Sequence, residues 1–190
     1  MRKRIITSLA LALLIVIRVR AADEQPKMPE PQKEHQWLKQ LAGDWDLDMQ
    51  MQEPGKDVMR AKGAESARLI GGFWIQTEVK ATMMDMPFTG MMTVGYDIQK
   101  KKYVATWIDS MSDYLWKYDG SLDQSAKILT LETVGPCPMQ GGKMTRFKEA
   151  IEIKDKDHRL FTSTVDFDGK WVQVLTINYT RKTATAAARN

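Results

Sequence analysis

Apolar and polar residues alternate strictly over residues 45–52, directly after a glycine. The apolar positions are Trp45, Leu47, Met49 and Met51. A period of two sends successive side chains to opposite faces, so it predicts a strand with one buried face and one solvent face. The preceding residues, 34–42, place Trp37, Leu38 and Leu41 on one side of a short helix, which Gly43 ends. The sequence therefore predicts a short helix that is followed at once by a strand.

Strand patterns repeat through the rest of the chain. Nine further strands are expected at residues 60–70, 73–81, 89–96, 103–110, 114–119, 126–134, 143–154, 159–167 and 171–180. Every connection is too short for a crossover helix, so consecutive strands must pair antiparallel. An open meander would leave two bare edges, and closure removes both. The sequence thus predicts an all-β fold, an antiparallel up-and-down barrel of about ten strands with a short N-terminal helix and room for a cavity. A two-sheet sandwich is the alternative.

The two ends of the chain have a different character. Residues 1–4 are basic, residues 5–17 are almost entirely apolar, and small residues follow at Val19 and Ala21. This pattern predicts a signal peptide over residues 1–21 and an exported, periplasmic or secreted protein; a retained anchor helix is the alternative. We expect a flexible leader at residues 22–33, the barrel domain at residues 34–181 and a disordered tail at residues 182–190.

Cleavage would change the charge of the chain. Residues 1–21 hold five of the 28 basic residues and none of the 24 acidic ones, so the remaining chain has 23 basic residues and a net charge of −1. We therefore expect no nucleic-acid partner, and no membrane partner after cleavage; the oligomeric state stays open. Cys137 is the only cysteine, so no internal disulfide forms. It lies within residues 135–142, which we expect to form a loop carrying an inert thiol.

Several blocks of sequence resemble one known family. In chain order they are Trp37-Leu38, Leu41 to Trp45, Gly71 to Trp74, Thr93 to Asp97, Thr106 to Ile108, Gly120 to Asp123 and Asp157 to Arg159. Together they are similar to a bacterial family called domain of unknown function 1579. The resemblance implies a calycin-like barrel, similar in outline to lipocalins and fatty-acid-binding proteins. It implies no activity and no catalytic residue.

Carboxylates on inward strand faces are the most informative candidates for a site. If Trp45 points inward, the alternation also sends Glu65 and Glu149 into the barrel. A buried carboxylate needs a partner or a proton, so it can orient a ligand, act as acid and base, or belong to a structural network with Arg, Tyr or trapped water. The residues expected to contact a ligand are Glu65, Met92, Trp107, Trp116 and Glu149.

The sequence disfavours two cofactors, Cu(I) and haem. Residues 83–92 are rich in methionine, whose thioether suits Cu(I). No His or Cys joins them, and we favour a flexible hairpin loop whose methionines cover one mouth of the barrel or contact an apolar ligand. The two histidines, His35 and His158, flank a helix and a turn, so we expect both at the surface and neither as a haem ligand. No metal and no cofactor are expected.

No catalytic motif stands out in this sequence. The shape therefore favours an exported protein that binds a small apolar or amphipathic molecule inside a barrel. One alternative is an enzyme of the isomerase or hydrolase type that uses the interior carboxylates. The other is a structural protein with a solid core.

Overall fold

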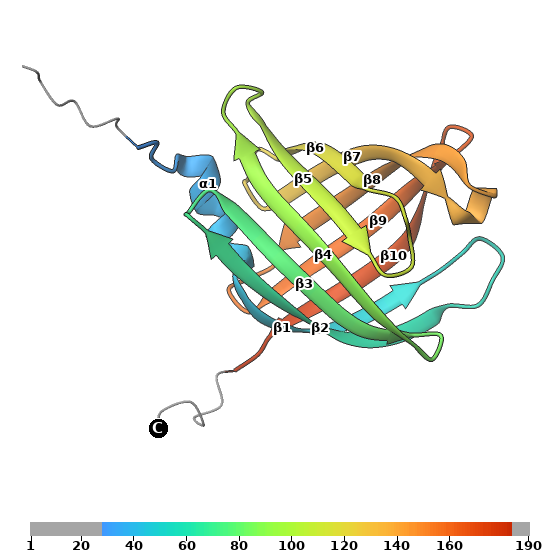
Figure 1. Ribbon diagram of the computed structural model, residues 1–190. Helices are drawn as coiled ribbons and strands as arrows, with labels where there is room; N and C mark the ends of the chain where they lie inside the picture. Colours follow the sequence, from blue (N-terminus) through green and yellow to red (C-terminus); the bar gives the residue numbers. More distant parts are fainter. Residues whose placement is uncertain (1–27, 184–190) are drawn as a thin grey trace, which may run out of the picture. The chain divides into compact units, whose positions relative to one another are not determined.

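Each strand of the protein pairs with its neighbours in sequence, and the first strand also pairs with the last (Figure 1). The computed structural model describes residues 28–183, and the ten strands form one closed antiparallel barrel. The strands are β1 (Gly43–Met51), β2 (Met59–Ile70), β3 (Trp74–Met83), β4 (Met86–Asp97), β5 (Lys102–Asp109), β6 (Trp116–Leu122), β7 (Ile128–Cys137), β8 (Lys143–Ile153), β9 (His158–Phe167) and β10 (Lys170–Arg181). The predicted barrel is confirmed, and the two-sheet sandwich was wrong.

Strand β1 fixes which side of the sheet is buried. Trp45 is 1% exposed, and Leu47 and Met49 are buried on the same face. Trp45 pairs with Glu65 of β2 on one side and with Arg181 of β10 on the other. The alternation predicted from the sequence is therefore the alternation between the inside and the outside of the barrel.

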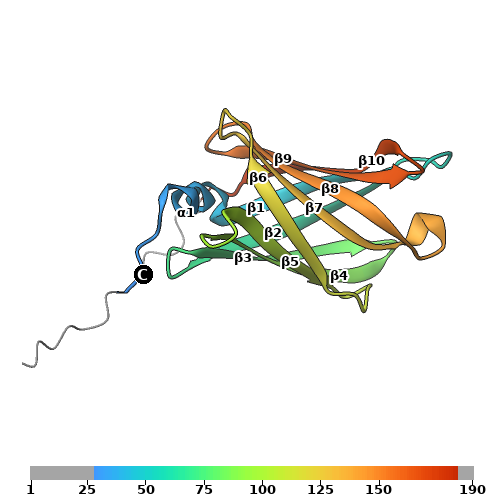
Figure 2. The ribbon, with the colours of Figure 1, turned by 90° about the horizontal axis from the view of Figure 1, so that it is seen from above.

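A short helical segment covers one end of the strands (Figure 2). The single helix expected at residues 34–42 is divided into α1 (Lys33–Trp37) and a 3₁₀ turn, η1 (Leu38–Leu41). Leu38 and Leu41 are buried in the core at this end, and the indole Nε1 of Trp37 donates a 2.8 Å hydrogen bond to the carbonyl of Ala126. The segment is therefore packed into the barrel rather than resting on its surface.

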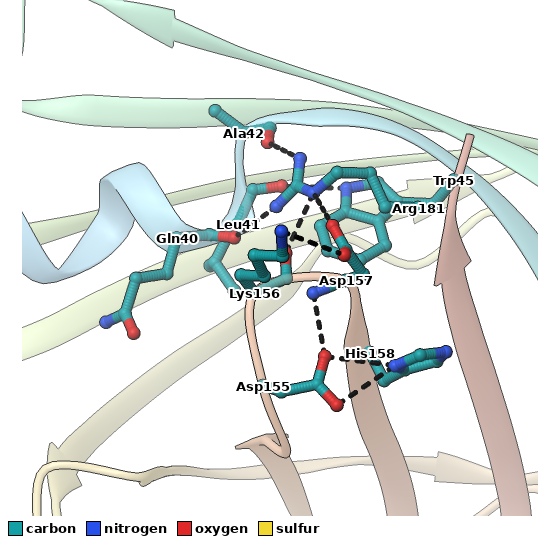
Figure 3. Close-up of polar contacts among 9 residues, drawn as sticks. All are labelled: Gln40, Leu41, Ala42, Trp45, Asp155, Lys156, Asp157, His158 and Arg181. Carbon is teal, nitrogen blue, oxygen red and sulfur yellow. Dashed lines mark hydrogen bonds and ion pairs between the residues drawn. The ribbon is translucent and has the colours of Figure 1, made fainter. Parts of the chain in front are cut away.

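His35 contradicts its predicted place at the surface. Its side chain is buried at 3% exposure, with Nε2 3.1 Å from the carbonyl oxygen of Tyr96 and the ring edge-on to Phe73. The packing of α1 over the sheet buries it, and that packing joins residues far apart in sequence. His158 lies at the surface as predicted, 2.9 Å from a carboxylate oxygen of Asp155 (Figure 3).

Arg181 fastens the closing strand to the helical segment (Figure 3). Its guanidinium donates hydrogen bonds to the carbonyls of Ala42 (2.6 Å) and Lys156 (2.9 Å), and it lies 4.0 Å from the ring centre of Trp45. Gly43 has φ +134°, and a Cβ there would lie 2.2 Å from a nitrogen of Arg181. The positive φ thus favours glycine two residues before the tryptophan, and any other side chain there would also displace the Arg181 guanidinium.

Only part of the segment around Cys137 is the loop that its composition predicts. Strand β7 continues to Cys137, and residues 138–142 leave the sheet, the first three of them as the 3₁₀ turn η2. The thiol is fully buried in a cluster with Phe147 and Val165. The two prolines that indicated a loop sit in the last strand residues and in η2 instead.

The Met-rich segment is a tight hairpin rather than a flexible loop. Strand β3 ends at Met83 and β4 begins at Met86. The two residues between them, Met84 and Asp85, have φ of 49° and 62°, as the two-residue turns of hairpins require. The hairpin therefore has a defined register, in which Met83 faces Met86.

The predictions for the chain ends fall mostly outside the described residues. These are the signal peptide at residues 1–21, half of the leader and most of the tail. Between residues 28 and 183 no helix has the length and apolar character needed to cross a membrane.

Candidate functional site

The barrel encloses a cavity of about 190 Å³. Most of its wall is apolar and comes from nearly every strand, together with Leu41 of η1. The polar residues in the wall are Glu65, Thr77, Tyr118, Glu149, Arg159, Ser163 and Tyr179. The site is therefore an apolar chamber with a few specific polar groups, as small-molecule sites commonly are.

Four of the five residues expected to contact a ligand line this cavity. They are Glu65, Met92, Trp107 and Glu149. Trp107 lies over Gly90, where a Cβ would be only 2.2 Å from the indole ring, so the missing side chain of Gly90 makes room for it.

Trp116 is not among the lining residues. Its ring packs edge-on against Phe147 at 5.0 Å between centroids, and it lies directly over Gly135. Because Gly135 has no side chain, the indole has room to pack in a separate cluster near Cys137. The predicted face of the strand is correct, and the predicted contact with the cavity is not observed.

A buried ion pair lies at one end of the cavity wall. The guanidinium of Arg159 donates a hydrogen bond to Glu65, and each side chain is 5% exposed. The same guanidinium lies 4.0 Å from the ring centre of Tyr179 and 4.5 Å from that of Trp45. Burial raises the pKa of Glu65, and the charge and hydrogen bond of Arg159 act against that rise. Two aromatic faces and one carboxylate thus hold the cation in place.

The sequence contained a signal for Arg159 that the prediction did not use. Arg159, Phe161, Ser163 and Val165 occupy alternate positions of β9, and all four lie on its inner side. The same alternation that placed Glu65 inside would have placed Arg159 inside. Tyr179 follows in the same way from its place in β10, opposite Arg159.

Glu149 is the second buried carboxyl, and no cation of the described part of the chain pairs with it. The hydroxyl of Ser163 donates a 3.2 Å hydrogen bond to its Oε1. Burial raises the pKa of Glu149 to about 8, and the Ser163 hydrogen bond lowers it only in part. At neutral pH this side chain is therefore an uncharged carboxylic acid, which can donate as well as accept a hydrogen bond.

Two buried side-chain polar atoms have no hydrogen-bond partner within residues 28–183. They are Oε2 of Glu149 and Nε of Arg159, and both residues line the cavity. Buried polar atoms are nearly always paired in folded proteins. These two are therefore the atoms of the wall that are left for a ligand or bound water to satisfy.

The described part of the chain offers no grouping of three or more His, Cys, Asp or Glu side chains suited to a metal ion. The methionines of residues 83–92 lie on both sides of the barrel wall, because Met92 lines the cavity whereas its neighbour Met91 is on the outer face. This division does not favour a single Cu(I) site built from their thioethers.

Comparison with known proteins supplies a family and a fold. The family described as "Protein of unknown function (DUF1579)" matches residues 30–181. None of the curated proteins matches the sequence.

Two solved structures have the same kind of barrel. Rv2717c from M. tuberculosis aligns with a TM-score of 0.60 and 11% identity, over 81% of this chain and 100% of that protein. The S-type phycobiliprotein lyase CPES from Guillardia theta aligns with a TM-score of 0.56 and 11% identity, over 82% of this chain and 100% of that protein. At such identities the likeness concerns the fold alone.

Proposed function

Because the chain belongs to the DUF1579 family, whose description assigns no activity, we propose a function from the cavity itself. The protein is an exported binding protein that holds a small apolar or amphipathic molecule inside its barrel. Export is supported by the pattern of residues 1–21. Determining the N-terminal sequence of the protein recovered from its host's exported fraction tests whether these residues are removed.

The enclosed volume is the observation that supports binding. Protein interiors are packed as densely as organic crystals, with few voids larger than one water molecule. A single water requires about 10–15 Å³ on a comparable measure, and this cavity provides about 190 Å³. A structural protein with a solid core would have filled this space with side chains.

Uptake of a neutral fluorescent probe tests the proposal. N-phenyl-1-naphthylamine brightens in an apolar site, so the wild-type protein should bind it at one site per chain. Native mass spectrometry of protein purified from its host should in addition show a mass above that of the polypeptide. A wild-type protein that gives neither signal would refute the proposal.

Two neighbouring methionines offer a matched pair of variants. Met92 lines the cavity and Met91 is exposed on the outer face of the same strand. Met92→Trp should fill the cavity and abolish probe uptake, whereas Met91→Trp should leave it unchanged. Circular dichroism checks that both variants fold. Equal uptake by the two variants would place the probe somewhere other than in the cavity.

Glu149 supports a second candidate function, an enzyme that uses an interior carboxyl. A buried acid that keeps its proton near neutral pH is what general acid catalysis requires, and burial raises the pKa of Glu149 to about 8. Glu149→Gln would then abolish turnover of a substrate while leaving its uptake intact. A variant that retains full turnover would exclude this role.

A further inference from the structure

The polar groups of the cavity carry information on the charge of its ligand. Among the residues that the structure describes, Arg159 is the one cation in the wall, and Glu65 already occupies one of its amino groups. The two formal charges cancel, and the rings of Trp45 and Tyr179, which lie edge to face with one another, both pack against the guanidinium. A second carboxylate placed beside Arg159 would leave one negative charge uncompensated in an apolar chamber, which is strongly unfavourable.

The other polar cluster also favours a neutral partner. Glu149 receives a hydrogen bond from Ser163 on one oxygen and leaves Oε2 free. Within residues 28–183, no cationic side chain forms an ion pair or hydrogen bond with Glu149. If the carboxyl keeps its proton it donates to a ligand oxygen but offers no positive charge, and if it loses that proton it repels an anion. In neither state does the cluster neutralise a carboxylate ligand.

The two clusters lie at different depths in the barrel. Arg159 and Ser163 belong to the same strand and are four residues apart, which corresponds to roughly 13 Å along a strand. One small polar group therefore cannot bridge both clusters. A ligand with one oxygen at one cluster must place its remaining length against the apolar wall.

We propose that the cavity accepts uncharged amphipathic molecules with a hydrogen-bonding oxygen, such as long-chain alcohols or ketones, and rejects fatty acid anions. This inference rests on the proposed binding function and adds the chemical class of the ligand. The oxygen of the ligand accepts a hydrogen bond from the Glu149 carboxyl, and the alkyl chain fills the apolar part of the chamber.

Three probes of equal chain length test the charge preference. Binding of 1-decanol, decanoic acid and decylamine to the wild-type protein is measured by calorimetry near pH 7, where the second is an anion and the third a cation. Decanol should bind about tenfold more tightly than either charged probe, since each of them must lose its hydration without gaining a free counter-ion.

Each other order of affinity overturns the inference in a distinct way. Tighter binding of decanoate would show that Arg159 still accepts a carboxylate. Tighter binding of decylamine would show that Glu149 acts as a counter-ion. Failure of all three to bind would overturn the proposed binding function as well, whereas binding in the wrong order overturns only the inference about charge.

A variant of Glu65 should abolish the preference for decanol over decanoate. Glu65→Gln frees the guanidinium of Arg159, so decanoate affinity should rise about tenfold while decanol affinity stays the same. Glu78→Gln is the control, because Glu78 is on the outer side of β3 with its side chain 42% exposed. Decanoate affinity that is unchanged in a folded Glu65→Gln protein would contradict the role assigned to the ion pair.

A double variant covers the case in which Glu65→Gln does not fold. Removing one partner of a buried pair is strongly destabilising, whereas replacing both with apolar groups is often tolerated. Glu65→Leu combined with Arg159→Met removes both charges, and it should keep the preference for decanol because no cation remains. A preference of this variant for decanoate would refute the inference.

Discussion

Replacing Glu149 with glutamine should change how the stability of the protein depends on pH. Burial raises the pKa of this carboxyl from its ordinary value of 4.5 to about 8. Between these two pH values the folded protein keeps a proton that the unfolded chain has released, so the free energy of unfolding falls as the pH rises. Each pH unit in this range lowers it by about 1.4 kcal/mol, which amounts to about 5 kcal/mol over the whole range.

Glutamine has nearly the same shape as a protonated glutamate and cannot ionise. Glu149→Gln should therefore match the wild-type protein below about pH 5 and exceed its free energy of unfolding by about 4 kcal/mol at about pH 8, with a plateau above about pH 9. Urea unfolding followed by tryptophan fluorescence at a series of pH values measures the difference. Subtracting the two proteins removes the contributions of the other ionisable groups.

Glu132→Gln is the matched control. Glu132 lies on β7 with its side chain 63% exposed and forms an ion pair with Lys148 on the outer face. Such an exposed pair contributes at most about 1 kcal/mol, so this variant should follow the wild-type curve across the series. The reasoning is refuted if the difference between wild type and Glu149→Gln does not grow with pH, because Glu149 would then be ionised in the folded protein.

Two substitutions and one labelling experiment test the packing. Gly90→Ala should lower the free energy of unfolding by about 1–3 kcal/mol in urea, because the new Cβ would meet the ring of Trp107 at 2.2 Å; an unchanged midpoint would contradict this. Arg181→Lys should cost about 2 kcal/mol by the same assay, since a lysine cannot reproduce the fork that bonds the Ala42 carbonyl, and a neutral outcome would argue against its fastening role. The thiol of Cys137 is fully buried, so it should react with a disulfide reagent only after unfolding, and fast labelling of the native protein would show that β7 opens.

The strands could be predicted from the sequence because alternation is a local property. Nine residues of β1 suffice to show which side is buried, and short turns carry that choice from each strand to the next. The inward placement of Glu65 and Glu149 followed from this rule alone. The barrel followed as well, since a meander of this length has two edges to satisfy.

The partners inside the barrel could not be predicted in the same way. Arg159 and Glu65 are 94 residues apart, and only the closure of the sheet brings their strands onto a common wall. His35 was misplaced for a related reason, because its burial depends on Tyr96, 61 residues away. Trp116 shows a third limit: the pattern gives the face of its strand, but Gly135 on the adjacent strand decides where the indole lies.

The pairing of β1 with β10 has a consequence for how the protein is made. Until a ribosome has synthesised residues 170–181, β1 and β9 each present an unpaired backbone edge, and such edges promote association between chains. The last strand also brings Leu175, Ile177 and Tyr179 to the chamber wall. The fold is thus completed and the cavity is formed in a single event. A chain truncated before β10 would aggregate and would not form a ligand-free barrel.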